Sequence, residues 1–161
     1  MKTHVVDYEA LGPLQRQALE QLELPPEQQQ YVGGIFAALH ALASAAKDDA
    51  RGFALLVDNA PRGFFVLKHG ALLPPWADPG TATLHGLMID VQWQGRGLGK
   101  HCLQALPALA RTLWPGVRQL MLSVDPENRP ALGLYLSLGW VDCGTAYRSR
   151  LGYERRLVLA L

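Results

Sequence analysis

The sequence predicts a mixed α/β (α+β) fold, and three observations lead to this prediction. An apolar, β-branched stretch at residues 83–90 is followed at once by a glycine-rich turn and a long helical segment. Helices alternate with strands in the second half, which is typical of parallel strand pairing. Two strand-like runs in the first half are joined by Asp58-Asn59-Ala60-Pro61, a hairpin turn, so the sheet is expected to be mixed.

The first half is expected to begin with a short strand at residues 3–6. Apolar residues then recur at helical spacing over residues 9–22 and again over 28–46, which predicts two helices. Leu24-Pro25-Pro26 separates them, because proline cannot continue helical hydrogen bonding. Gly33-Gly34 lowers the helix propensity early in the second helix. The hairpin strands are expected at residues 52–57 and 63–68.

The second half begins with a loop at residues 72–80 and continues with the central strand. A helix is expected from Gly97 to about Leu113, where Trp114-Pro115-Gly116 stops it. Further segments are a strand at 119–124, a short helix at 131–138 capped by Gly139, and strands at 140–147 and 155–161. The expected order is β-α-α-β-β-β-α-β-α-β-β.

Composition excludes several classes of protein. The 161 residues carry a formal net charge of +1 and contain no basic run, which argues against nucleic acid or an anionic membrane as a partner. Cys102 and Cys143 are the only cysteines, and the five histidines are scattered, so neither a disulfide framework nor a metal site is predicted. No apolar run is as long as a membrane span. We expect one domain, residues 1–161, in a soluble cytoplasmic protein.

The glycine-rich turn is Gln94-Gly95-Arg96-Gly97-Leu98-Gly99-Lys100. Glycines let the backbone bend tightly, and the free N–H groups at the start of the following helix favour a phosphate or pyrophosphate. A P-loop is excluded, because Gln94 stands where its first glycine belongs and His101 follows the lysine. The dinucleotide pattern G-x-G-x-x-G fails as well, because Cys102 or Lys100 holds its last place.

The turn does fit the pattern Q/R-x-x-G-x-G/A at Gln94, Gly97 and Gly99. A second stretch, from Asn128 through Ala131, Leu134 and Tyr135 to Gly139-Trp140, fits N-x-x-A-x-x-L-Y-x-x-x-G-F, with tryptophan replacing the last aromatic. Both motifs resemble signatures of the GNAT superfamily of N-acetyltransferases, and the resemblance covers nearly the whole chain. It implies a mixed, mostly antiparallel sheet with a splayed central strand.

Several shorter pieces resemble bacterial spermine/spermidine (diamine) acetyltransferases more closely. They are Pro26-Glu27 with Tyr31-Val32, Gly63-Phe64-Phe65, Leu87-Met88-Ile89-Asp90 with Gln94-Gly95, Leu122-Ser123-Val124 before Pro126-Glu127-Asn128, and Cys143-Gly144.

The resemblance implies acetyl-CoA as co-substrate, without a metal. Backbone groups of the central strand would bind the pantetheine arm, and an N–H near Met88 would donate to the thioester carbonyl. Tyr135 would protonate the departing sulfur, although a core tyrosine is the alternative, and Asn128 would contact the coenzyme, although it is also a good helix N-cap. The implied cofactor-binding residues are Leu87, Met88, Ile89, Asp90, Gln94, Gly95, Arg96, Gly97, Leu98, Gly99, Lys100, Asn128 and Tyr135.

The general base is less well defined by the sequence. Alternation places Thr81, Thr83 and His85 on one face of the central strand, where many relatives have a glutamate. His85 is the only titratable residue of the three, and an unperturbed imidazole suits a base at neutral pH. A histidine that merely packs beside the sheet, or a water chain to a carboxylate such as Glu27, are the alternatives.

The predicted function is therefore acetyl transfer from acetyl-CoA directly to the primary amine of a polyamine-like small molecule. Acetylation of a protein N-terminus or lysine is a second hypothesis, and a non-catalytic acyl-CoA-binding module is a third, kept open by the missing glutamate. A homodimer is also left open.

Overall fold

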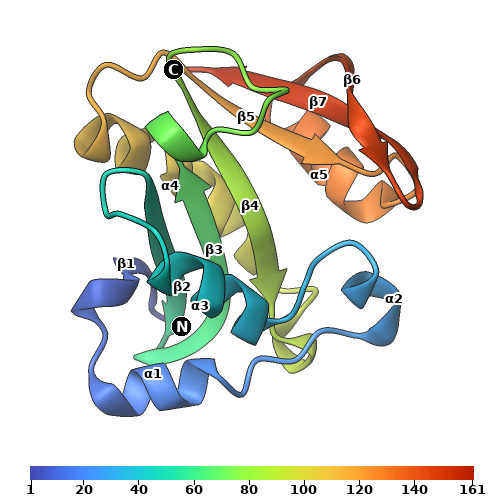
Figure 1. The fold of residues 1–161 in the computed structure, drawn as a ribbon. Coiled ribbons are helices and arrows are strands. Elements are labelled where there is room, and N and C mark those ends of the chain that lie inside the picture. Colours follow the sequence, from blue (N-terminus) through green and yellow to red (C-terminus); the bar gives the residue numbers. More distant parts are fainter.

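The computed structural model describes residues 1–161 and contains one seven-stranded sheet with helices on both faces (Figure 1). The strands are β1 (Thr3–Asp7), β2 (Ala50–Val57), β3 (Ala60–Lys68), β4 (Thr81–Ile89), β5 (Gln119–Val124), β6 (Val141–Ser149) and β7 (Gly152–Ala160). The helices are α1 (Pro13–Leu19), α2 (Pro26–Gln29), α3 (Ile35–Ala43), α4 (Leu98–Leu113) and α5 (Arg129–Ser137). Short 3-10 turns are η1 (Tyr8–Ala10), η2 (Gly70–Leu72) and η3 (Val91–Trp93).

The sheet is mixed and mostly antiparallel, as the sequence predicts. Its strand order is β1-β2-β3-β4-β5-β7-β6, and only β4 and β5 run parallel. These two strands pair only at residues 81–83 of β4 and 119–121 of β5. Beyond that point they diverge (Figure 1), so the edge of β4 that faces β5 is unpaired from Leu84 onward. The expected splayed central strand is thereby confirmed.

A β-bulge in β4 lies where the strands begin to part. Val66 pairs with His85 and Phe64 pairs with Met88, so two residues of β4, Gly86 and Leu87, face one residue of β3. Gly86 has φ +62°, a conformation that glycine adopts without steric cost. Bulges bend a strand and shift the alternation of its side chains. Leu84 therefore packs in the core on the α4 side of the sheet, and after the bulge Leu87 and Ile89 pack against that same core.

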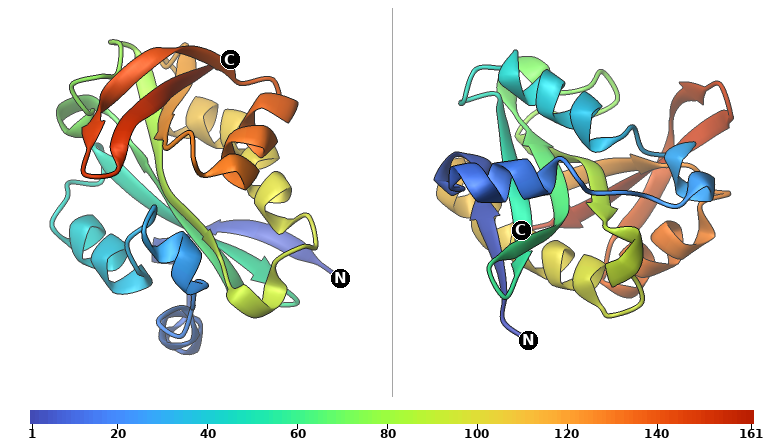
Figure 2. Two further views of the ribbon diagram at one scale, coloured as in Figure 1. Left: turned by 90° about the vertical axis from the view of Figure 1, so that its right-hand side faces the viewer. Right: turned by 90° about the horizontal axis from the view of Figure 1, so that it is seen from below.

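Two hydrophobic cores lie on opposite faces of the sheet, because β2 and β3 are apolar on both sides. Phe53, Leu55 and Val57 of β2 pack against α4, whereas Ala54 and Leu56 pack with Leu19 of α1 and Ile35 of α3. Figure 2 shows α3 and α4 on the two sides of the sheet. Each large side chain buried in this way stabilises the fold by about 1.5–3 kcal/mol.

The helices of the first half are shorter than expected. The segment 9–22 forms η1 and α1, separated by Leu11-Gly12, and the segment 28–46 forms α2 and α3 with residues 30–34 between them. The glycine pair interrupts the long helix predicted over residues 28–46. Gly34 is extended, with ψ 174°, and is the N-cap at which α3 begins. The order is consequently β-α-α-α-β-β-β-α-β-α-β-β, with one helix more than predicted.

The remaining elements agree with the sequence to within a few residues. The hairpin turn consists of Asp58 and Asn59, which both have positive φ, as the tight two-residue turn requires. Strand β7 begins at Gly152, three residues before the predicted start at 155, and Gly139 ends α5 with φ +95°. None of the helices combines the length and apolar character that a membrane crossing demands.

Candidate active site

The glycine-rich turn after β4 exposes a continuous row of backbone donors. No N–H group from Gly95 to Lys100 donates a hydrogen bond to a protein acceptor. Gly95 and Gly97 have φ +76° and +77°, and Gly97 is the N-cap of the sixteen-residue helix α4. The free N–H groups and the positive end of the helix dipole therefore converge on one site, as the sequence predicts for an anion.

Gln94 fixes this turn to two other elements. Its Nε2 atom donates to the carbonyl of Ile89 at 2.9 Å and to Oε1 of Gln28 at 3.0 Å. Gln28 returns a bond from its own Nε2 to Oε1 of Gln94 at 3.1 Å. The two amides form a reciprocal pair that ties α2 to the glycine turn. Gln28 was not predicted, because nothing local in the sequence connects residue 28 with residue 94.

Positive charge gathers beside the turn. The guanidinium carbons of Arg62 and Arg96 lie 4.5 and 4.4 Å from the ring centroid of Trp93, within the range of cation–π attraction. Lys100 lies in the first turn of α4. Two arginines beside Trp93 and the lysine of α4 thus lie near the turn, and a ligand with more than one phosphate fits this arrangement.

A first cavity of about 420 Å³ extends from β4 across the turn to α5. Its lining includes nine of the predicted residues: Leu87, Ile89, Gln94, Gly95, Gly97, Leu98, Gly99, Lys100 and Tyr135. The others come from α2, η3 and α5: Gln28, Trp93, Pro130, Ala131 and Leu134. The lining is apolar toward β4 and α5 and polar at the glycine turn, which suits a ligand with a phosphorylated end and a longer, less polar arm.

Four predicted cofactor residues lie outside this cavity. Met88 is buried in the core beside α1 and α3, so only its backbone is available to a ligand. The Asp90 carboxylate accepts bonds from the N–H groups of Glu23 and Gln92, so it shapes the chain. Arg96 stacks on Trp93. Asn128 lines a second cavity, and although it is the N-cap of α5, its side chain makes no capping bond.

The second cavity, of about 210 Å³, lies where β4 and β5 have separated. Polar side chains from five segments line it: Tyr31, His85, Ser123, Asp125, Asn128, Tyr147 and Glu154. Only His85 and Asn128 of these were predicted site residues. The others are carried by the segment after α2, by β5 and its following turn, and by the β6–β7 hairpin. Glu27 is exposed on α2 and lines neither cavity.

The two cavities share three residues, Leu87, Ala131 and Tyr135. Tyr135 packs its ring against Trp140, with centroids 6.0 Å apart, and no protein group hydrogen-bonds to its hydroxyl. Burial raises the pKa of Tyr135 to about 12, so the hydroxyl is protonated at neutral pH and available as a donor. A reactive group brought through the first cavity would meet a molecule in the second beside this side chain.

His85 lies on the wall of the second cavity, next to the bulge. Its Nε2 atom is 2.7 Å from the Thr83 hydroxyl, as expected for two residues on one face of β4. Burial, with a smaller contribution from the charge of Lys68, lowers the pKa of His85 from 6.5 to about 3. The imidazole is therefore neutral throughout the physiological range, but it is a much weaker base than an exposed histidine.

No group of three or more His, Cys, Asp or Glu side chains forms a metal-binding arrangement. The donor set of the first cavity instead consists of backbone N–H groups and cations, which is the chemistry that binds phosphates.

Comparison with known proteins gives a family match over most of the chain. The model of the acetyltransferase (GNAT) family matches residues 15–140. The uncharacterized N-acetyltransferase YbbJ of Bacillus subtilis is 30% identical over 100 residues, which cover 61% of this chain and 61% of YbbJ. The [ribosomal protein bS18]-alanine N-acetyltransferase of Salmonella typhimurium is 35% identical over 83 residues, 50% of this chain and 55% of that protein.

A solved structure shares the fold. Aminoglycoside acetyltransferase AAC(6')-Ib, in complex with ribostamycin and coenzyme A, superposes with a TM-score of 0.76 at 16% identity, covering 99% of this chain and 94% of that one. The matches to the two curated relatives span only about 55–61% of the relatives' own length.

Proposed function

Since the chain belongs to the acetyltransferase (GNAT) family, we propose that it transfers an acetyl group from acetyl-CoA directly to the primary amine of a small molecule. The observation that carries this proposal is the junction of the two cavities at Leu87, Ala131 and Tyr135. One cavity accommodates the coenzyme and the other accommodates the amine, so the thioester and its attacking nitrogen meet without a covalent enzyme intermediate. We also propose that residues 1–161 form a single domain.

The hydrogen-bond donors of the first cavity suit the phosphates of coenzyme A. The free N–H groups from Gly95 to Lys100 bind the pyrophosphate, and Lys100, Arg96 and Arg62 balance the charge of the phosphates. The pantetheine arm lies along the unpaired edge of β4 and bonds to its backbone groups, as an added strand would.

The donor to the thioester carbonyl can be narrowed to one N–H group. The sequence suggested an N–H near Met88. The N–H of Asp90 donates to the carbonyl of Arg62 on β3 at 2.8 Å, so in regular alternation Met88 also turns toward β3. Leu87 and Ile89 then turn toward the open edge, and of these only Leu87 lines both cavities. Its N–H is our candidate for stabilising the oxyanion.

The reaction forms one bond, breaks another, removes a proton from nitrogen and adds one to sulfur. A neutral amine attacks the thioester carbon, the C–N bond forms, and the C–S bond breaks as sulfur leaves with the electron pair. The nitrogen then loses one proton to the base, and the sulfur gains one. Tyr135 donates a hydrogen bond or its proton to that sulfur, because its hydroxyl is protonated and the residue lines both cavities. Asn128 is the N-cap of the same helix, and its amide is free to orient the coenzyme or the amine.

The group that removes the proton from the amine is either His85 or a water relay. The low pKa of His85 makes it a poor acceptor in the free protein, which favours a relay through water to a carboxylate. Glu27 lines neither cavity, so a short relay does not end at Glu27.

The acceptor is proposed to be small and polyamine-like. The second cavity, about 210 Å³, is smaller than the roughly 300–1,000 Å³ of typical ligand sites, so it accommodates one short amine rather than a large ring system. The closer sequence resemblance to spermine/spermidine acetyltransferases supports the same class. Acetylation of a protein N-terminus is the second candidate, supported by the relative named as an alanine N-acetyltransferase of a ribosomal protein.

A coenzyme-release assay tests the proposal. Purified protein and acetyl-CoA are mixed with a panel of aliphatic mono- and diamines, aminoglycosides and short peptides with alanine N-termini, and free thiol is followed with time. We expect turnover with the small aliphatic amines. Peptide turnover alone would favour the second candidate. Tight acetyl-CoA binding without release for any member would favour a non-catalytic acyl-CoA-binding module and contradict the proposal.

A further inference from the structure

Two carboxylates and no cationic side chain line the second cavity. The carboxylates are those of Asp125 and Glu154. His85 adds no positive charge at neutral pH, because burial and Lys68 lower its pKa to about 3. Arg155 and Arg156, the neighbours of Glu154 in the chain, pair with Asp142 and Asp78 instead. A molecule entering the cavity therefore meets carboxylates without competing cations.

Asp125 directly follows the end of β5, and Glu154 lies on the adjacent strand β7. Val124 of β5 pairs with Arg155 of β7, so the antiparallel register brings Asp125 next to Glu154. Side chains placed opposite one another in this way have Cβ atoms about 5 Å apart, and like charges there repel. Asp125 uses one oxygen for the N–H of Glu127, at 2.9 Å, and is buried. A bound cation would remove the repulsion between the two groups.

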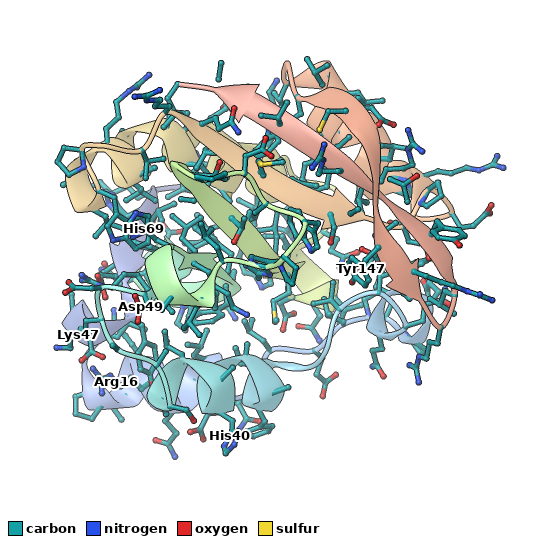
Figure 3. The ribbon with its side chains drawn as sticks, turned by 45° about the horizontal axis from the view of Figure 1, so that its top comes forward. Arg16, His40, Lys47, Asp49, His69 and Tyr147 are labelled. Atoms are coloured by element: carbon teal, nitrogen blue, oxygen red, sulfur yellow. The ribbon has the colours of Figure 1, made fainter.

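Aromatic side chains flank the acidic pair. Tyr31 comes from the segment after α2 and Tyr147 from β6, and both line the cavity. Figure 3 shows Tyr147 on the side of the β6–β7 hairpin that faces α2. Glu154 lies close enough to Tyr147 to contribute to the rise of its pKa, after the larger effect of burial. Carboxylates combined with tyrosine rings are the surroundings that bind alkylammonium groups.

The acidic pair is unsuited to the nitrogen that reacts. An amine held between two carboxylates is stabilised as an ammonium ion, which has no lone pair for attack on a thioester. The reacting nitrogen belongs at the junction beside Tyr135, where the nearby imidazole of His85 is neutral. Asp125 and Glu154 line only the second cavity and lie outside that junction.

We propose that Glu154, together with Asp125, binds a second, non-reacting ammonium group of the acceptor, so that the substrate class is the short aliphatic diamines. This inference rests on the proposed function, because it assigns the far end of the same acceptor cavity. Glu154 acts as a specificity-determining residue, and Tyr147 and Tyr31 pack against the methylene and ammonium groups.

The test compares two acceptors that differ only in the second charge: putrescine and n-butylamine. Wild-type protein is expected to prefer putrescine in kcat/KM by about tenfold to a hundredfold, the usual effect of one charge-assisted hydrogen bond. Glu154→Gln keeps the size of the side chain and should abolish most of that preference by raising the putrescine KM. Its n-butylamine KM and acetyl-CoA affinity should stay as in the wild type.

Glu127→Gln is the matched control, because Glu127 is exposed and lines neither cavity, yet its replacement changes the net charge equally. It should retain the putrescine preference. Equal kcat/KM for the two amines with wild-type protein, or an unchanged preference in Glu154→Gln, would overturn the inference. Absence of turnover with every amine would instead contradict the proposed function, so the two failures are distinguishable.

Discussion

Tyr135 carries the only polar side chain that lines both cavities, and the chemistry of the site depends on its hydroxyl. A phenol with a pKa near 12 keeps its proton at neutral pH, and a departing thiolate is the strongest acceptor expected at the junction. The ring has a separate role, because it packs against Trp140. The sequence motif predicted the position of Tyr135, and the structure adds that its hydroxyl is free of protein partners.

Tyr135→Phe separates these two roles. Turnover should fall by roughly 10- to 1,000-fold, because the proton donor is lost. Acetyl-CoA affinity, measured by calorimetry, and the thermal midpoint should change little, since the ring remains. Tyr153→Phe is the control, because Tyr153 is 60% exposed on β7 and lines neither cavity. Wild-type turnover in Tyr135→Phe would remove the hydroxyl from the mechanism.

At the scale of elements, the β4–turn–α4 unit is what positions the coenzyme. Gly99 lies in the first turn of α4 and lines the first cavity, and an added Cβ would lie 3.6 Å from Leu134, an ordinary contact. Gly97 differs, because its φ of +77° strains any other residue by about 1–2 kcal/mol. A substitution at Gly99 therefore tests the ligand contact without testing the fold.

Gly99→Val should weaken acetyl-CoA binding about a hundredfold or more, because the side chain keeps the phosphates from the N–H groups and costs at least one charge-assisted bond. Binding is measured by calorimetry and folding by circular dichroism. Gly133→Ala, at an open position in α5, is expected to bind normally and to be more stable by about 1 kcal/mol. Unchanged affinity in Gly99→Val would contradict the phosphate assignment.

The short helix α2 links the two cavities. Four residues cannot form a stable helix by themselves, so the Gln28–Gln94 amide pair holds α2 in place. Tyr31 and Val32, directly after α2, line the acceptor cavity.

Gln28→Ala should therefore raise the amine KM at saturating acetyl-CoA by about three- to tenfold, equivalent to one neutral hydrogen bond. The effect reaches the acceptor cavity although Gln28 lines only the first one. Gln30→Ala is the comparison, since Gln30 is exposed and bonds only to the nearby carbonyl of Glu27. The same amine KM in both variants would show that α2 does not couple the cavities.

The elements that the sequence predicted well are those with local signals. The glycine turn, α4 and α5 begin and end at glycines or prolines, and β5 is a short apolar run between them. The bulge at Gly86 was missed because it depends on the register with β3. Gln28, Tyr147 and Glu154 were missed because their neighbours in the cavities lie far away in the chain, so tertiary packing alone brings them there.

At the scale of the whole molecule, the splay between β4 and β5 creates the site and also buries a titratable group. His85 lies beside the bulge, in the wall of the gap, and loses hydration on folding. Its folded pKa of about 3 lies below the unfolded value of 6.5, which is the reverse of a histidine stabilised by an acidic partner. The stability of the fold must then depend on pH through this residue.

The direction of this dependence follows from proton counting. Between pH 6.5 and about 3 the unfolded chain protonates His85 while the folded chain does not, so the free energy of unfolding falls as the pH is lowered through this window. From pH 7 to pH 4.5 the loss of stability from this residue is on the order of 2–3 kcal/mol.

His85→Gln retains a hydrogen-bonding partner for Thr83 but cannot titrate, so denaturant midpoints at these two pH values should differ less in the variant. His40→Gln, at an exposed position on α3 (Figure 3), should behave as the wild type does. An equal loss of stability in His85→Gln and the wild type would show that this imidazole does not resist protonation in the folded protein.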